Sequence, residues 1–261
     1  MKRGGLVSFV GAGPGDPELI TLKGLRRLRE ADVVIHDRLI PGEVLEQTRP
    51  RVEVIDVGKA PGRPCLGQGE INRLLVDRGA GGRHVVRLKG GDPTIFGRLA
   101  EEIEAVRTAG LAFEVVPGIT SATAAAARAG ISLTERGSSS TVVFATGAVH
   151  GNRKALALDW DLLAHTGGTL VFYMPVGRLE SVTASLTSLG RDPREPAILI
   201  ERVGVVGERV IAGRLGDISE RGRAAGVAAP ALLITGPTVA AASEPATVRR
   251  VASHLAGVSD G

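Results

Sequence analysis

Short apolar segments alternate with segments of helical periodicity through the first half of this 261-residue chain. Val33-Val34-Ile35 is apolar at three consecutive positions, a pattern typical of a parallel strand that is buried on both faces. Alternation of such strands with helices predicts an open parallel sheet. We expect strands over residues 6–10, 32–37, 52–57, 85–88 and 113–116, and helices over residues 19–31, 68–78 and 98–109.

The pattern changes after the break at Pro117-Gly118. We expect helices over residues 120–128 and 179–189, strands over 141–146, 169–174, 197–201, 208–213 and 231–235, and a short terminal helix from residue 241 onward. The sequence therefore predicts two α/β domains, with a parallel sheet in residues 1–118 and a mixed sheet in residues 119–261.

The composition argues against several classes of partner. The net charge of +4 is spread along the chain, and no run of Lys and Arg is interleaved with aromatic residues, so we expect no nucleic-acid surface. Cys65 is the only cysteine, which excludes an internal disulfide and a cysteine-based metal cage. The apolar run 6–10 is too short for a signal peptide, and no apolar segment is long enough to cross a bilayer. We expect a cytoplasmic protein with no membrane partner and no metal.

Three glycine-rich turns follow three of the expected parallel strands. The first, residues 11–16, fails as a dinucleotide fingerprint because Asp16 takes the place of the last glycine and Pro14 removes a backbone donor. The second holds Gly90-Gly91-Asp92, and the third begins at Pro117-Gly118. Because the carboxyl ends of parallel strands meet at one edge of the sheet, the three turns predict a binding site for a nucleoside-like ligand. Tight turns without a ligand are the alternative.

Several segments in these turns and around them carry a resemblance to a known family. They are VGAGPGDPEL (10–19), TLKG (21–24), Asp37-Arg38-Leu39, Val57-Gly58-Lys59, VVRLKGGDP (85–93), IFGR (95–98), FEVVPGITSA (113–122) and FYM (172–174). Together they resemble the tetrapyrrole methylase family, and within it the branch that methylates uroporphyrinogen III. The resemblance covers roughly residues 6–236.

The resemblance implies two α/β domains with S-adenosylmethionine bound in the cleft between them, S-adenosylhomocysteine as product, and a homodimer. Nine positions match the positions at which the family contacts this cofactor: Pro14, Gly90, Gly91, Asp92, Ile95, Thr120, Ser121, Met174 and Val203. Val203 stands where relatives often have glycine, which matters little if the contact is made through the backbone.

Acid–base residues are also implied by the resemblance. Asp37 and Lys59 match the positions proposed as proton acceptor and proton donor, and Arg87 is expected at the base of the same cleft. Transfer of a sulfonium methyl to a pyrrole-type carbon needs no metal, but a proton must leave the ring, and a carboxylate such as Asp37 is suited to orient or accept it. An Asp that only caps a turn is the alternative. His36 either relays a proton or simply ends a strand.

The departures from the family pattern concentrate on the acceptor side. We predict a substrate pocket formed by Arg38, Leu99, Glu135 and Pro175, in which Glu135 replaces a histidine and His36 replaces a tyrosine. One like-charge contact between a glutamate and a polycarboxylate costs about 1 to 4 kcal/mol. We therefore expect a C-methyltransferase acting on a smaller aromatic acceptor, such as an indole at C3 in specialised metabolism. The alternative is a uroporphyrinogen-III C-methyltransferase that makes precorrin-2 for siroheme or cobalamin, with Glu135 facing solvent.

Other functional classes fit the sequence less well. A dinucleotide-dependent oxidoreductase is disfavoured by Asp16 and Pro14, and a binding module without catalysis is disfavoured by the retention of Asp37, Lys59 and Arg87. A diphthine-synthase-like methyltransferase acting on a protein fits the segment 88–93 poorly.

Overall fold

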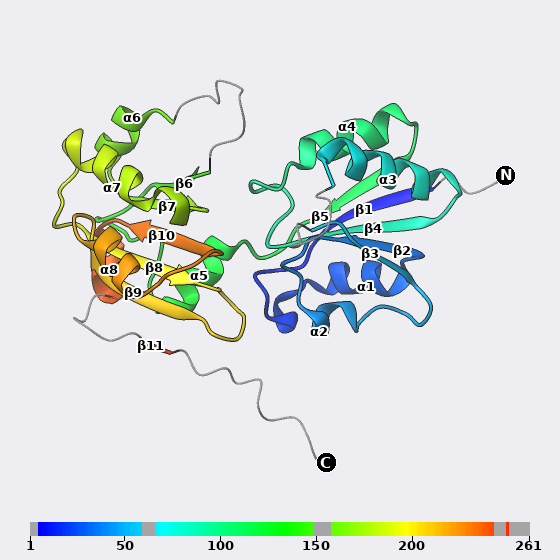
Figure 1. The fold of residues 1–261 in the computed structure, drawn as a ribbon, viewed down its shortest axis with the longest axis horizontal. Helices are drawn as coiled ribbons and strands as arrows, with labels where there is room; N and C mark the ends of the chain where they lie inside the picture. Colours follow the sequence, from blue (N-terminus) through cyan, green and yellow to red (C-terminus); the bar gives the residue numbers. More distant parts are fainter. Residues whose placement is uncertain (1–4, 59–65, 149–157, 243–248, 251–261) are drawn as a thin grey trace, which may run out of the picture. The chain divides into compact units, whose positions relative to one another are not determined.

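Two separate sheets organise the chain (Figure 1). The computed structural model describes residues 5–58, 66–148, 158–242 and 249–250. The chain divides into two compact units, residues 1–121 and residues 122–261, so the division follows Ser121 where the sequence suggested Gly118. We propose that these units are the two domains expected from the sequence.

The sheet of the first unit has five strands in the order β3-β2-β4-β1-β5, all paired in parallel. The strands are β1 (Leu6–Gly11), β2 (Val33–His36), β3 (Glu53–Asp56), β4 (His84–Lys89) and β5 (Ala112–Val116). Each expected strand of this half is present. The expectation of a strand buried on both faces holds for β2 but not for β3, where Val54 is 44% exposed, because β3 lies at the edge of the sheet.

Two helices pack on each face of this sheet (Figure 1). Helices α1 (Leu22–Glu30) and α2 (Gly42–Leu45) bury Leu28 and Val44 on one face, and α3 (Gln68–Ala80) and α4 (Leu99–Thr108) bury Leu75 and Val106 on the other. Apolar strand residues that alternate in direction fill both layers, which explains why these strands are apolar at consecutive positions.

Local capping sets the start of the first helix. The hydroxyl of Thr21 accepts a hydrogen bond from the backbone N–H of Gly24, so α1 begins at Leu22, and a separate 3-10 turn, η1, covers Pro17–Leu19. The expected helix over residues 19–31 is therefore shorter than predicted. Helix α2 was not expected, because its four residues are too few to show helical periodicity.

The second unit has a mixed sheet in the order β11-β9-β8-β10-β7-β6. Its strands are β6 (Val142–Thr146), β7 (Thr169–Tyr173), β8 (Pro196–Glu201), β9 (Arg209–Arg214), β10 (Ala231–Thr235) and β11 (Arg249–Arg250). Only β6 and β7 pair in parallel among these neighbours, and the other described pairs are antiparallel.

Three helices cover one face of the second sheet. Helices α6 (Trp160–His165), α7 (Leu179–Ser188) and α8 (Ile218–Ala224) bury Leu163, Leu186 and Ile218 against β7, β8 and β10. Of these, only α7 was expected, since α6 and α8 are short. The alanine-rich helix α5 (Ser121–Ala129) agrees with the sequence, and 3-10 turns η2 (Val176–Arg178) and η3 (Pro237–Ala242) complete the described elements.

The terminal helix expected from residue 241 is wrong in the part that the structure describes. Residues up to 242 belong to η3, and residues 249–250 form β11, which pairs with β9. The rest of that expected helix lies outside the described residues. Among the described helices, none combines the length and the apolarity needed to cross a membrane.

Candidate active site

The three glycine-rich turns of the first unit interlock through their backbones. Gly13 and Gly91 exchange two hydrogen bonds, with N···O distances of 2.7 and 3.3 Å. A Cβ added to Gly11 would lie 2.6 Å from the carbonyl oxygen of Gly91, and one added to Gly118 would lie 2.3 Å from the same oxygen. Glycine is thus required at both positions because no side chain fits between the turns. The expected meeting of the three turns at one sheet edge is confirmed.

Asp92 fastens two of these turns together. Its Oδ2 accepts a hydrogen bond from the backbone N–H of Gly118 at 3.0 Å, and its Oδ1 accepts from the backbone N–H and the hydroxyl of Thr94 at 2.8 and 2.5 Å. Both carboxylate oxygens therefore serve the fold. A contact between Asp92 and a ligand would use the lone pairs that these bonds leave free.

Gly90 differs from the other glycines of the interlock. It is exposed, and a Cβ added to it would meet no protein atom within 4 Å. Its neighbour Gly91 has a φ of +66°, and a Cβ there would lie 3.7 Å from the backbone nitrogen of Ser121 and 3.8 Å from the Cα of Thr120. The structure thus brings Gly90, Gly91, Thr120 and Ser121 together and leaves one side of Gly90 open. Pro14 and Ile95 lie in the same turns and are half-buried.

Asp37 follows β2 at the same edge of the sheet. Its Oδ1 accepts a hydrogen bond of 2.5 Å from Nη2 of Arg87, whose side chain is 3% exposed, whereas that of Asp37 is 38% exposed. A charge-assisted bond of this kind fixes the direction of the carboxylate. Asp37 and Arg87, which were expected to belong to the same site, are therefore in contact, and Asp37 still reaches solvent.

A buried ionic cluster stands behind this pair. Nε of Arg87 donates to Glu102 Oε1 at 3.1 Å, and Nζ of Lys89 donates to Glu102 Oε2 at 2.9 Å. Burial lowers the pKa of Arg87, but attraction to Asp37 and Glu102 outweighs it, so that the pKa is raised. Lys89 and Glu102 were not predicted as site residues. The available signal was the pair of cations at 87 and 89, two apart on one face of an otherwise apolar strand.

His36 ends β2 beside Asp37, is 8% exposed, and places Nδ1 3.0 Å from the backbone oxygen of Asp37. This contact orients the ring, and its role as a proton relay stays a prediction. Lys59, the predicted proton donor, lies outside the described residues.

The remaining predicted cofactor positions belong to the second unit. Strands β7 and β8 both pair antiparallel with β10, so Met174 and Val203 follow strand ends at the same edge of that sheet. Met174 is 46% exposed with a φ of +52°, a region that non-glycine residues seldom occupy. Val203 is buried. The hydroxyl oxygen of Tyr173 accepts a hydrogen bond of 3.3 Å from the backbone N–H of Ala122, which joins the start of α5 to the strand that precedes Met174.

A second buried carboxylate supports the turn at Val203. Glu208 is 3% exposed, accepts a hydrogen bond of 2.8 Å from the backbone N–H of Gly204, and forms an ion pair of 2.7 Å with Nε of Arg128. It thereby ties the end of α5 to the turn. Arg128 and Glu208 were missed by the sequence analysis, since 80 residues separate them and no spacing signals such a pair.

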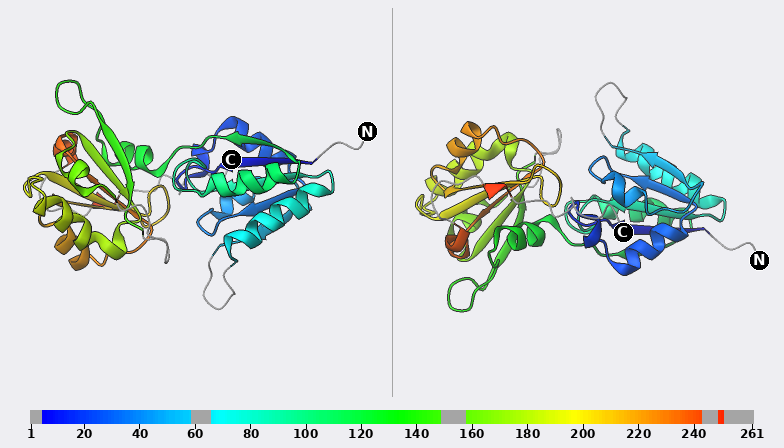
Figure 2. Two further views of the ribbon diagram at one scale, coloured as in Figure 1. Left: turned by 90° about the horizontal axis from the view of Figure 1, so that it is seen from above. Right: turned by 90° about the horizontal axis from the view of Figure 1, so that it is seen from below.

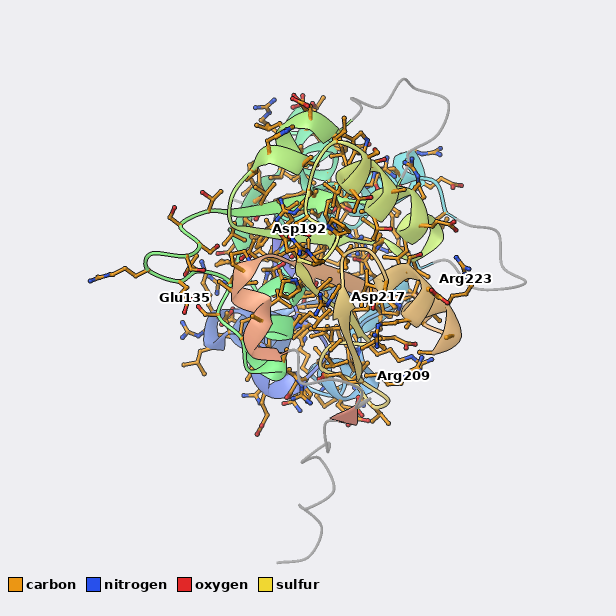
Figure 3. The ribbon with its side chains drawn as sticks, turned by 90° about the vertical axis from the view of Figure 1, so that its left-hand side faces the viewer. Glu135, Asp192, Arg209, Asp217 and Arg223 are labelled. Carbon is orange, nitrogen blue, oxygen red and sulfur yellow. The ribbon has the colours of Figure 1, made fainter. Side chains whose placement is uncertain are left out.

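The four residues predicted for the substrate pocket occupy different environments. Arg38 is exposed beside Asp37, while Leu99 is half-buried against the apolar layer of α3 and α4. Pro175 is buried. Glu135 is exposed on a turn that projects from the second unit and is closed by its two backbone hydrogen bonds with Ser139 (Figures 2 and 3). Within the described residues, no group of three or more His, Cys, Asp or Glu side chains is arranged to hold a metal ion.

Residues 6–219 match the family model of the Tetrapyrrole (Corrin/Porphyrin) Methylases. The chain belongs to the tetrapyrrole methylase family. All the segments that suggested this family in the sequence analysis lie within the matched range, and the recognition is confirmed.

Relatives of this methylase include both curated proteins and solved structures. Siroheme synthase 3 of Aeromonas hydrophila is 46% identical over 243 residues, which make up 93% of this chain and 51% of that protein. The chain spans about half the length of these curated relatives. The native form of uroporphyrin III C-methyl transferase from Thermus thermophilus is 42% identical with a TM-score of 0.77, covering 91% of this chain and 100% of that chain. A cobalt precorrin-4 methyltransferase has a TM-score of 0.80 at 27% identity, covering 90% of this chain and 95% of that chain.

The Thermus thermophilus enzyme has also been solved in complex with S-adenosylhomocysteine. These relatives confirm the expected two-sheet α/β fold, the class of S-adenosylmethionine-dependent C-methyltransferases, and the cofactor. They do not test which residues of this tetrapyrrole methylase contact the cofactor.

Proposed function

We propose that this tetrapyrrole methylase is a uroporphyrinogen-III C-methyltransferase, the second of the two acceptors considered from the sequence. The observation that carries the proposal is the 42% identity to uroporphyrin III C-methyl transferase from Thermus thermophilus over that whole chain. The 46% identity to siroheme synthase 3 of Aeromonas hydrophila supports the same acceptor. Both names refer to tetrapyrrole chemistry, and neither refers to indoles.

The case for an indole acceptor depended on side chains whose surroundings now weaken it. Glu135 is exposed on a projecting turn, so its charge is largely screened by solvent and opposes an anionic acceptor little. Leu99 packs on the apolar core of the first unit, where an apolar residue has a structural reason to stand. The two departures therefore give no strong reason for a smaller acceptor.

The proposed cofactor contacts in the first unit are the open side of Gly90 with Gly91, Asp92, Pro14, Ile95, Thr120 and Ser121. Met174 and Val203 are the proposed contacts in the second unit. A ligand that lies flat against a backbone needs a position without a Cβ, and Gly90 offers one that no protein atom fills. S-adenosylmethionine, when bound, supplies an electrophilic methyl group on its sulfonium sulfur.

In the proposed reaction, Asp37 handles the proton of the acceptor. An electron-rich ring of the acceptor would gain one positive charge on taking the methyl group from the sulfonium, which would leave as the neutral thioether. The ring would then lose one proton, from a ring nitrogen or a neighbouring carbon, to become neutral again. Asp37 is exposed enough to meet that proton, and Arg87 fixes the orientation of its carboxylate. The exposed Arg38 beside it is a cation suited to the carboxylates of uroporphyrinogen. The homodimer and the cytoplasmic location remain predictions.

A methyl-transfer assay with uroporphyrinogen III and a tryptamine-type indole, run in parallel with S-adenosylmethionine and product masses recorded, tests the proposal. We expect methylated porphyrinogen and unchanged indole. Methylation of the indole with the porphyrinogen unchanged would overturn the proposal and restore the smaller acceptor.

A further inference from the structure

The carboxylate of Glu102 is fully buried between two cations. The side chain of Glu102 is 0% exposed, and those of Arg87 and Lys89 are each 3% exposed. Each carboxylate oxygen receives one of the two ion pairs, at 3.1 Å from Nε of Arg87 and 2.9 Å from Nζ of Lys89. The amide nitrogen of Gln68 on α3 donates a further hydrogen bond of 3.2 Å. Solvent does not screen these charges, so each of them acts strongly on the others.

The charges of this cluster cancel only when Asp37 is included. Arg87, Lys89 and Glu102 together carry one net positive charge, and the carboxylate of Asp37, bonded to Arg87, neutralises it. The other titratable or charged groups on the elements around the cluster and beside Asp37 are His36 and Arg38, Asp56 at the end of β3, His84 on β4, Glu70, Arg73, Asp77 and Arg78 on α3, and Arg98, Glu101, Glu104 and Arg107 at the start of α4 or along it. Arg98 and Glu101 bond to each other and cancel in charge.

The carboxylates of Glu102 and Asp37 both favour the charged form of Lys89. Burial lowers the pKa of Lys89, the positive charge of Arg87 lowers it further, and Glu102 and Asp37 act in the opposite direction. Lys89 and Asp37 therefore influence each other, although each is bonded to a different member of the cluster.

We propose that Lys89 and Glu102 are positioning residues that act through Arg87 to set the charge balance around Asp37, and thereby the pH range in which Asp37 accepts the proton of the acceptor. The inference rests on the proposed function, because it gives Asp37 the role of proton acceptor. Neither Lys89 nor Glu102 reaches the surface, so neither touches the acceptor itself.

A purely structural role for the cluster makes a different prediction. Buried ion pairs also tie β4 to α4, and loss of one partner leaves an uncompensated charge that lowers stability. If the role is purely structural, stability falls in every variant. The pH profile of catalysis then shows no opposite displacements for removal of a positive charge and removal of a negative charge.

The test compares Lys89→Met, Glu102→Gln and the double variant in kcat/KM for methylation of uroporphyrinogen III from about pH 3 to 8, a range that includes the acidic limb of an aspartate. Removal of the positive charge at Lys89 makes Asp37 harder to ionise, so the acidic limb moves to higher pH by about 0.5 to 1.5 pH units. Removal of the negative charge at Glu102 moves it to lower pH. The double variant has the original net charge and returns towards the wild-type limb.

Lys23→Met is the matched control. Lys23 and Arg27 share the carboxylate of Glu114 in the same unit, with ion pairs of 2.8 and 2.5 Å, as Lys89 and Arg87 share Glu102. We expect no displacement of the acidic limb in this variant. Thermal unfolding of all variants reports any loss of stability, and Lys89→Met alone decides the question if Glu102→Gln does not fold.

A readout that needs no activity separates this inference from the proposed function. The carboxyl ¹³C resonance of Asp37, assigned with Asp37→Asn, is titrated in wild type and in Lys89→Met. A higher titration midpoint in Lys89→Met supports the inference, whether or not uroporphyrinogen III is methylated. Absence of methylation by the wild-type protein would contradict only the proposed function. An unchanged midpoint and an unchanged acidic limb overturn the inference, whatever the acceptor.

Discussion

Replacement of Gly90 by alanine separates a contact with the cofactor from a contact within the protein. A Cβ at Gly90 meets no protein atom within 4 Å, and its backbone lies outside the left-handed region that favours glycine. Alanine therefore fits the folded chain and restricts the unfolded one. We expect the free energy of unfolding of Gly90→Ala to be unchanged or higher by up to about 1 kcal/mol.

The effect on the cofactor is expected to be large. If the open side of Gly90 is covered by the cofactor at van der Waals distance, the added methyl overpacks the contact, at a cost of about 1 to 3 kcal/mol. This corresponds to a dissociation constant for S-adenosylhomocysteine that is about 5- to 150-fold higher than in wild type. Stability and affinity thus move independently, which a general disturbance of the fold would not produce.

Isothermal titration calorimetry with S-adenosylhomocysteine, together with thermal unfolding of the free protein, measures both quantities. Gly69→Ala is the matched control, because Gly69 lies exposed on α3 and a Cβ there also meets no protein atom within 4 Å. Wild-type affinity in Gly90→Ala would refute the proposed contact. A fall in its Tm would refute the conclusion that this side of Gly90 is open to solvent in the free protein.

Three further changes follow from the same structure. Gly118→Ala places a Cβ 2.3 Å from the carbonyl oxygen of Gly91, so we expect a loss of about 1 to 3 kcal/mol in urea unfolding, and a wild-type unfolding curve would contradict the interlock. Burial opposes ionisation of Glu114, but hydrogen bonds from Arg27, Lys23 and Ser8 outweigh it and lower its pKa to about 2. This carboxylate therefore stabilises the fold fully above about pH 4.5, and its contribution is lost as the pH falls through about 2, so Glu114→Gln should cost at most about 3 kcal/mol at pH 7. In urea unfolding, a difference from wild type that stays constant down to pH 2 would contradict this. Asp37→Asn keeps an oxygen for Arg87 but removes the proton acceptor, so kcat should fall about 10²- to 10⁴-fold while the affinity for S-adenosylhomocysteine is retained, and full activity would exclude Asp37 as the base.

The sequence predicted the strands well, because an unbroken run of apolar residues can be recognised within a few neighbouring positions. Val33, Val34 and Ile35 are all fully buried in the structure, as the uniform apolar pattern indicated. The exposed alternate positions of β3 could not be predicted from that pattern, since a strand becomes an edge only through the order of its neighbours in space.

The sequence predicted those site residues that lie together in one motif. It did not predict contacts between residues that come from different helices and strands. The segment that holds Arg87 and Gly90 was visible as a unit in the sequence. The partner of Lys89, in contrast, is Glu102 on α4, and a sequence offers no means to choose it over the neighbouring Glu101, which is exposed. For Glu135 the sequence suggested a role that the structure does not support. Its replacement of a histidine suggested a pocket wall, but the residue is exposed on a turn that only the three-dimensional structure reveals.

The pairing of β1 has a consequence for how the chain is made. Strand β1 lies between β4 and β5, so both of its partners, residues 84–89 and 112–116, are synthesised after it. At usual rates of synthesis, about 5 to 20 s pass before both partners exist. During that time the apolar residues Val7, Phe9 and Val10, which are fully buried in the finished protein, have no sheet to join. The nascent chain is therefore a candidate client for chaperones that shield apolar strands, and synonymous changes that slow translation before residue 116 should lower the yield of folded enzyme more than equal delays after it.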